Sequence, residues 1–512
     1  MKKMFTSLLY LHTKQSELAQ PTPATLKDLQ LMKVFKAIQQ KSIQDLSEIF
    51  KHPLTNDSEI KYRQAIFQDL VRQPVLTTVN QFEREFLGHQ RFKAEISYHY
   101  DGEIRNYELL IILQQNLKSL AKLLKALDQL ACQSAGLRSW CLYLHKFFQA
   151  DPTKQLQAEI VDLTQKMQDL HYSLTISGAK ITVSQKIDQG MPLNDLLKQS
   201  FAPLLNSQSV VQNDLIKPIP QESGINNLQV LILHSLAKVY PAEFRELSRF
   251  YQEYFEFADP VIERVAQEFN FYTAVIKYQQ QIRQTYQVNF CYPQPVTAST
   301  ANTVTASFDL ALITMAPPKI ITNDFTLQPE ENFLIVSGPN QGGKTTFARM
   351  VGADYYLFQL GMPIPGKKAA LTIKRQILTH FERQEKASLL TGLLAADIER
   401  IYQIVTASDQ QTLVIFNELF SSTAVVDAEQ MGTTILQRLI KKGVTGVYVT
   451  FLAKLSSLPR TVSMQSQVSI QTTKRTFKII RGQPNNQAYA ISLLKSYHLT
   501  AAEIKRGGAD ES

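Results

Sequence analysis

The chain contains the stretch Gly338-Pro339-Asn340-Gln341-Gly342-Gly343-Lys344-Thr345, which has the spacing GxxxxGK followed by Ser or Thr. An apolar run over residues 333–336 precedes it and predicts a buried strand, and a helix is expected to begin near Lys344. Glycines let successive backbone N–H groups point inward, and the helix start adds the positive end of its dipole. The stretch therefore predicts a phosphate cradle, in which Lys344 reaches the β- and γ-phosphates of a nucleotide and Thr345 binds Mg²⁺. The alternative is an ordinary glycine-rich turn.

A second apolar run, residues 413–416, ends at Asn417 and Glu418. The carboxylate that follows such a strand emerges beside the γ-phosphate, so Glu418 is the candidate to orient or deprotonate the attacking water. Asn417 takes the place usually held by a Mg²⁺-associated aspartate. Its amide oxygen can accept a hydrogen bond from a metal-bound water but brings no charge, so weaker Mg²⁺ binding is expected. The alternative is a buried strand that ends in a solvated glutamate.

The two halves of the chain have different patterns. From residue 24 to about 290, apolar residues recur at three- and four-residue steps, which predicts helix after helix, with long helices over 109–127 and 260–286. A polar, proline-containing segment, residues 182–226, is the candidate tip or connection between long helices. After Cys291, short β-branched runs alternate with helical stretches, which is typical of an α/β layered domain.

Composition excludes several classes of protein. At ~150 residues per domain, 512 residues indicate about three domains. The 3 cysteines have no CxxC spacing, which argues against a disulfide framework or a thiolate zinc site and fits a reducing cytoplasm. No apolar run approaches the ~20 residues of a membrane-spanning helix, so no membrane association is expected.

Charge is a weaker guide to function. The net charge of +9 is diffuse and only mildly favours polyanionic partners. Lys118, Lys122 and Lys125 lie on one helical face at i, i+4 and i+7, and this row is either a solvated face or a contact to nucleic acid.

Residues 338–346, GPNQGGKTT, resemble the MutS family of DNA mismatch repair ATPases, whose loop reads GPNMGGKST; Gln341 and Thr345 are the two differences. The resemblance continues in the same order downstream. Residues 417–427 are similar to the family's DEIGRGTSTYDG segment, residues 449–455 to its ATHYHEL segment and residues 488–491 to its SYGI. The likeness is dense over 290–506 and weaker before it.

The resemblance implies an ABC-type ATPase whose two copies enclose ATP and Mg²⁺ between them. One subunit would contribute the loop residues up to Thr346, together with Glu385, Asn417 and the catalytic Glu418. Residues from the other subunit would complete the site: Thr391 and Gly392 at a helix start that corresponds to the ABC signature, and Ser422, Thr423 and Asp427. Such a homodimer would act as a helical clamp that closes on duplex or branched DNA with ATP and opens after hydrolysis.

The family organisation predicts a multidomain chain, with a mainly α-helical core, lever and clamp followed by an α/β P-loop (ABC-type) ATPase domain. The expected parts are helical core over 1–100, lever and clamp over 101–227, returning core and lever over 228–290, the ATPase domain over 291–506 and a disordered tail over 507–512. Because the core-like pattern begins near residue 25, the chain resembles a divergent bacterial member without the family's N-terminal mismatch-recognition domain.

Two residues depart from the family pattern. Asn417 replaces the usual aspartate, and Phe451 stands where many members place a histidine that senses the γ-phosphate. Both changes would slow hydrolysis. The sequence therefore predicts an ATP-hydrolysing DNA clamp without base-specific readout, and the rival interpretation is a slow ATP-gated module that clamps a ribosome, a structured RNA or a protein.

Overall fold

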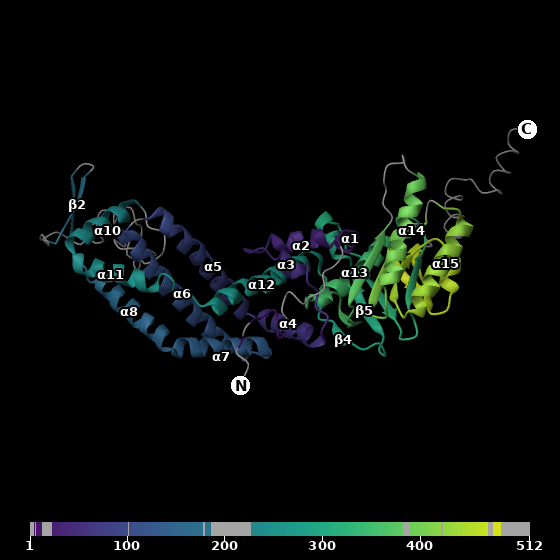
Figure 1. Ribbon diagram of the computed structural model, residues 1–512, viewed down its shortest axis with the longest axis horizontal. Helices are drawn as coiled ribbons and strands as arrows, with labels where there is room; N and C mark the ends of the chain where they lie inside the picture. Colours follow the sequence, from purple (N-terminus) through teal and green to yellow (C-terminus); the bar gives the residue numbers. More distant parts are fainter. Residues whose placement is uncertain are drawn as a thin grey trace, which may run out of the picture. The chain divides into compact units, whose positions relative to one another are not determined.

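The computed structural model describes residues 5, 7–12, 23–100, 102–177, 180–185, 227–381, 390–420, 423–468 and 475–482, and it divides into two compact units. The first unit takes in the described parts of Met1–Ser7 and Arg72–Phe269, and the second those of Leu8–Val71 and Asn270–Ser512 (Figure 1). The chain thus enters the second unit at Leu8, leaves it after Val71, and returns to it within the long helix α12 (Pro260–Tyr286). The predicted domain boundaries stay a prediction.

The first unit is built mainly from helices, because apolar residues on each helix share one face. Leu109 and Leu110 of α6 are fully buried together with Leu233, Leu236 and Leu247 from the helices beside it. The long helix expected over 109–127 is confirmed and lies within α6. The helices are α5 (Val75–His99), α6 (Gly102–Leu130), α7 (Ala135–Gln149), α8 (Asp151–Gln168), α10 (Asn227–Val239) and α11 (Pro241–Tyr254).

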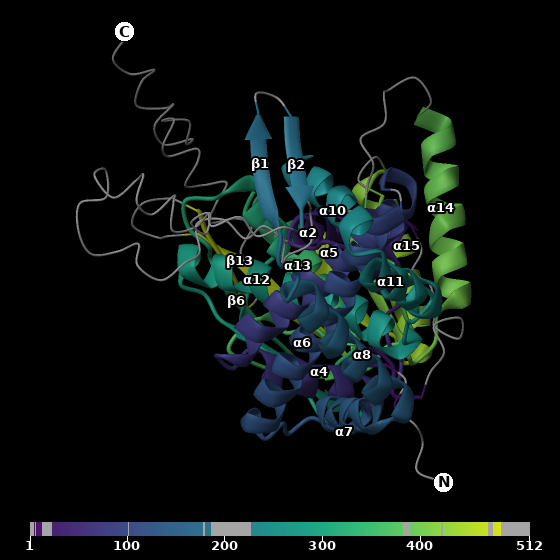
Figure 2. The same cartoon turned by 90° about the vertical axis from the view of Figure 1, so that its left-hand side faces the viewer.

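One part of the helical expectation is wrong. Strands β1 (Ser173–Ser177) and β2 (Lys180–Ser184) form an antiparallel hairpin in the first unit, where the sequence pattern predicts helices (Figure 2). The alternation of Leu174 with Ile176, and of Ile181 with Val183, is the two-residue period of a strand. Of the expected tip at 182–226, only residues 182–185 are described, and the remainder lies outside the described residues.

The second unit is organised around a six-stranded sheet of order β10-β11-β12-β7-β13-β14. All neighbouring pairs are parallel except β13 with β14, so β7, β11 and β12 end at the same edge. The strands are β7 (Phe333–Ser337), β10 (Gln376–Phe381), β11 (Thr412–Asn417), β12 (Thr445–Val449), β13 (Thr461–Val468) and β14 (Arg475–Arg481). The strands predicted over 333–336 and 413–416 are confirmed as parts of β7 and β11.

Helices cover this sheet in layers. Helices α14 (Leu390–Ala407) and α15 (Val425–Lys441) bury a cluster that includes Phe333, Ile335, Val414 and Phe416 on one face. Helix α13 (Lys344–Gln359) packs against β11 and β12 and is buried along almost its whole length. On its outer side, Arg349 donates to the Asp28 carbonyl of α1 (Pro23–Asp28) at 3.2 Å. Tyr356 contacts the Phe35 ring of α2 (Leu31–Gln39) and donates to the Phe50 carbonyl of α3 (Ser47–Phe50) at 2.7 Å. Helix α4 (Asp57–Leu70) follows these three in the chain.

Smaller elements complete the second unit. A four-stranded sheet has the order β4-β9-β5-β6, and β3 pairs with β8. Their bounds are β3 (Phe290–Cys291), β4 (Gln294–Val296), β5 (Asn302–Ser307), β6 (Asn323–Leu327), β8 (Ile364–Pro365) and β9 (Lys368–Thr372), with 3₁₀ helices η2 (Leu310–Met315) and η4 (Ala453–Ser457).

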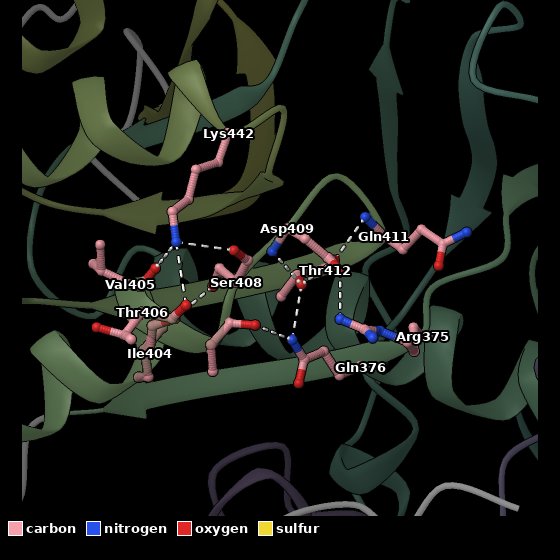
Figure 3. Close-up of polar contacts among 11 residues, drawn as sticks. Arg375, Gln376, Ile404, Val405, Thr406, Ser408, Asp409, Gln411, Thr412 and Lys442 are labelled. Carbon is pink, nitrogen blue, oxygen red and sulfur yellow. Dashed lines mark hydrogen bonds and ion pairs between the residues drawn. The ribbon is translucent and has the colours of Figure 1, made fainter.

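A polar corner fixes the far end of α14 (Figure 3). The ammonium of Lys442, just after α15, donates to the carbonyl oxygens of Val405 at 2.6 Å, Thr406 at 3.2 Å and Ser408 at 3.1 Å. These carbonyls end a helix and have no partners within it, and the cation also complements the negative end of the helix dipole. Asp409 beside them binds Arg375, so this corner is structural.

The mixed organisation expected from the sequence, helical first and α/β layered after Cys291, is confirmed in outline. Among the described helices, none combines the length and the apolar character needed to cross a membrane.

Candidate nucleotide-binding site

The glycine-rich loop, residues 338–345, joins the end of β7 to the start of α13, as the sequence predicts. Gly338 has φ +125° and Gly343 has φ +92°, backbone conformations that residues with a Cβ rarely adopt. The amide of Phe347 donates to the carbonyl of Gly343 at 2.9 Å, which sets the first turn of α13. The loop therefore surrounds the N-terminus of a buried helix, where backbone N–H groups attract anions.

Close packing against β13 explains a third glycine. A Cβ on Gly342 would lie 2.4 Å from the Ser466 hydroxyl oxygen, which itself donates to the Gly342 carbonyl at 2.7 Å. A Cβ on Gly338 would lie 2.8 Å from the Cβ of Ser466. Sequence reasoning did not find Ser466, because no motif marks it and it follows the loop by more than 120 residues.

Lys344 lies inside the loop with 4% of its side chain exposed. Its ammonium donates to the carbonyl oxygens of Gly338 at 2.9 Å and Pro339 at 3.2 Å and to the side-chain oxygen of Asn340 at 3.4 Å. The Phe451 ring covers it, with its centroid 4.2 Å from the ammonium nitrogen. Burial lowers the pKa of Lys344, and the nearby Glu418 carboxylate partly opposes this shift.

Thr345 and Asn417 meet at the strand ends. The Thr345 hydroxyl donates to the amide oxygen of Asn417 at 2.9 Å. Glu418 follows with φ +56°, and its amide donates to the carbonyl of Val449 at 2.9 Å, which fixes this left-handed turn. One Glu418 oxygen lies 4.0 Å from the Lys344 ammonium. The structure thus brings together the lysine, the hydroxyl and the acid that the sequence singles out.

These groups open into a cavity of about 340 Å³. Asn340, Gln341, Gly343, Thr346 and Glu418 line one side of it, with Lys344 and Thr345. Its other lining residues, which the motifs did not reveal, are Leu312, Lys319, Ile321, Asn323 and Phe477. Among the described lining residues Lys319 and Lys344 are basic and Glu418 alone is acidic, so the cavity favours an anion.

The oxygen donors fit a magnesium ion that arrives with phosphates. Mg²⁺ in phosphate sites keeps several waters and takes only one or two protein oxygens. The Thr345 hydroxyl supplies one such oxygen, and the Asn417 amide oxygen beside it can accept a hydrogen bond from a metal-bound water. Within the described residues, no cluster of three or more His, Cys, Asp or Glu forms a separate metal site.

Comparison with known proteins gives this site a family. Residues 334–506 match the family model described as MutS domain V. This segment of the chain is therefore similar to domain V of the MutS family. It is 23% identical over 196 residues to the endonuclease MutS2 of Thermus thermophilus, a match that covers 38% of this chain and 26% of that protein.

Other relatives give similar values. Over 192 residues the chain is 25% identical to endonuclease MutS2 of Gemmatimonas aurantiaca, covering 36% of this chain and 23% of the relative. Over 140 residues it is 26% identical to the DNA mismatch repair protein MutS of Thermotoga sp., and the match covers 27% of this chain and 18% of that relative. These matches span about a quarter or less of each relative's own length.

Of the described residues expected from the partner subunit of a MutS-family dimer, Thr423 and Asp427 are not among those that line the loop cavity. Thr391 and Gly392 belong to the first turn of α14. Thr423 and Asp427 line a second cavity of about 600 Å³, which also includes Ile398, Tyr402 and Arg438 of the described residues. Glu385 and Ser422 lie outside the described residues, as do residues 488–491 and the tail 507–512.

Proposed function

We propose that this chain binds ATP with Mg²⁺ and hydrolyses it in the cavity beside the glycine-rich loop. The single observation that carries the proposal is the convergence of Lys344, the Thr345–Asn417 pair and Glu418 at the N-terminus of α13. An ABC-type ATPase domain over 291–506 is part of this proposal.

Phosphate binding would change the partners of Lys344. Its ammonium now neutralises the carbonyl dipoles of Gly338 and Pro339, and the β- and γ-phosphates would replace these carbonyls with formal negative charges. Loop N–H groups between Asn340 and Thr346 would hold the remaining phosphate oxygens. Mg²⁺, bound by the Thr345 hydroxyl and through water by Asn417, would supply charge neutralisation for the phosphates.

The opposite end of the cavity suits a nucleotide base. Leu312, Ile321 and Phe477 give it apolar and aromatic surface, on which a flat ring can stack. Asn323 is held in place because its side-chain amide donates to the Phe477 carbonyl at 3.1 Å and its oxygen accepts from the amide of Ile479 at 2.8 Å. One end of the cavity would thus take the base and the other the phosphates.

Glu418 would activate the attacking water. The water oxygen forms a bond to the γ-phosphorus, the bond between that phosphorus and the β–γ bridging oxygen breaks, and the water proton passes to the Glu418 carboxylate. The left-handed backbone at Glu418 directs its side chain from the end of β11 toward Lys344. The products are ADP and inorganic phosphate.

A homodimer would complete this site. Asp427 is exposed at the start of α15. The two preceding residues, Val425 and Val426, are also exposed, by 67% and 75%, although their side chains are apolar. A second copy packed on this segment would cover them and bring Thr391, Gly392, Ser422 and Thr423 toward the first copy's nucleotide. Glu385 is proposed to belong to the same site as Glu418.

The biological substrate follows from the family. Relatives named as DNA mismatch repair protein and as endonuclease favour a clamp on duplex or branched DNA, acting in repair or recombination through backbone contacts. One observation favours a second candidate, a slow ATP-gated module on a ribosome, RNA or protein. Phe451 covers Lys344 where many members have a histidine, and Asn417 adds no charge to the metal site.

An ATPase assay with and without homoduplex, mismatched and branched DNA tests the proposal. Lys344→Ala should abolish nucleotide binding, and Glu418→Gln should retain ATP and accumulate the dimer in light-scattering measurements. Lys441→Ala, at an exposed lysine in the last turn of α15, is the matched control and should behave as the wild type. A wild-type protein that binds no ATP would refute the proposal, while ATP turnover indifferent to every DNA would favour the second candidate.

A further inference from the structure

Gln341, at the apex of the glycine-rich loop, has a backbone conformation that glutamine avoids. Its φ is +58°, in the left-handed region, although it carries a Cβ. Residues other than Gly, Asn and Asp enter this region only where their surroundings hold them there. Gln341 also lines the proposed nucleotide cavity, so its conformation helps to set the shape of the phosphate cradle.

Arg475, the first residue of β14, holds the Gln341 side chain. Its guanidinium donates to the Gln341 side-chain oxygen at 2.6 Å. The strand that carries Arg475 is itself held in the sheet, because Arg475 pairs with Val468 of the neighbouring strand β13. Arg475 therefore joins the loop apex to the sheet.

The other loop contacts act on different residues. Ser466 of β13 binds the Gly342 carbonyl, and the Gly342 amide donates to the carbonyl of Pro339 at 3.2 Å. Arg475 is not among the described residues that line the cavity, so it does not reach the space where phosphates would lie. Its action on a nucleotide must pass through Gln341.

We propose that Arg475 is a positioning residue that keeps the loop apex in its left-handed, phosphate-ready conformation before nucleotide arrives. The proposal rests on the proposed ATP-binding function. Without Arg475, Gln341 relaxes toward ordinary φ values, and binding must then restore the strained conformation. ATP affinity falls, whereas the hydrolysis of ATP already bound does not change.

The test is a double-mutant cycle read by titration with a fluorescent ATP analogue. Arg475→Ala should raise the Kd for ATP by about five- to ten-fold. This factor is the free-energy cost of a left-handed non-glycine residue converted into a ratio of dissociation constants. The turnover rate at saturating ATP should stay at the wild-type value. Arg475→Lys, which keeps one donor, should show a smaller rise.

Rescue distinguishes positioning from a general effect on the fold. Gln341→Gly removes the penalty, because glycine adopts positive φ freely, so Gln341→Gly/Arg475→Ala should bind ATP within about two-fold of Gln341→Gly alone. Arg481→Ala, on the same strand but bound to Glu331, is the matched control and should leave the Kd unchanged.

Two results would overturn the inference: a wild-type Kd in Arg475→Ala, or a double variant as weak as Arg475→Ala alone. Either result leaves the ATP-binding proposal standing if the wild type binds and Lys344→Ala does not. A wild type that fails to bind refutes the function itself.

Discussion

Replacing Phe451 by leucine should tighten ATP binding, because the Phe451 ring competes with phosphate for Lys344. The ring centroid lies 4.2 Å from the ammonium nitrogen, within the range of a cation–π interaction. Leucine keeps apolar contact over the lysine stem but removes the aromatic face. Lys344 would then lose one of the interactions that it must give up to reach the β- and γ-phosphates.

The size of the effect follows from burial. Cation–π pairs are worth about 0.5–1 kcal/mol at exposed sites and about 2 kcal/mol when desolvated. Lys344 is 4% exposed and Phe451 46%, so this pair falls between the two limits, at about 1–1.5 kcal/mol. Since 1.4 kcal/mol corresponds to a factor of ten, the Kd for ATP should fall about five- to ten-fold.

Titration of wild type and Phe451→Leu with a fluorescent ATP analogue measures this change directly. Tyr402→Leu, which removes an exposed aromatic ring from the second cavity, is the matched control and should have the wild-type Kd. An unchanged or higher Kd in Phe451→Leu would refute the competition, since it would mean that Lys344 keeps its ring contact when ATP is bound.

Three further outcomes are expected. Asn417→Asp adds a charge beside the Thr345 hydroxyl, so the Mg²⁺ concentration for half-maximal ATPase activity should fall about ten-fold; an unchanged Mg²⁺ titration would contradict the assigned metal site. Burial raises the pKa of Asp309 from 3.8 to about 6, so the native state keeps a proton that the unfolded chain loses, and stability falls as pH rises through that window. Above pH 6, Asp309→Asn should therefore raise the free energy of unfolding by up to about 3 kcal/mol, as measured by urea unfolding. If the free energy of unfolding depended on pH in the same way in both proteins, Asp309 would be excluded as the cause. Gly446→Ala would put a Cβ 2.1 Å from a carbonyl oxygen of β11 and should lower the free energy of unfolding by about 3 kcal/mol or more. Gly88→Ala, whose Cβ would enter open space beside α5, should instead raise the melting temperature.

The parts of the site that sequence could predict are those held within short stretches of chain. Residues 338–345 contain their own turn, helix start and cation, so the spacing alone predicts the cradle. The strand ending at Asn417 and Glu418 is similarly local. Their meeting could be expected because parallel strands that share a sheet end at the same edge. The 2.9 Å contact of Thr345 with Asn417 agrees with that expectation.

Contacts that return from distant sequence could not be predicted. Ser466 and Arg475 reach the loop across sequence separations of 124 and 134 residues, and neither belongs to a motif. Leu312 and Phe477 line the cavity because η2 and β14 happen to border it. The β1–β2 hairpin was missed for a different reason, since its short alternating runs were outweighed by the helical pattern on both sides.

The insertion of residues 72–269 into the second unit also sets an order for synthesis. Phe35 of α2 packs against Tyr356 of α13, which is translated 321 residues later. At about 5–20 residues per second, this interval is roughly 15–60 s. During that time the apolar face of α2 leaves the ribosome without its partner, and the chain of the inserted unit is completed before Tyr356 is made. The unit that lies in the middle of the sequence is therefore the first able to complete its core.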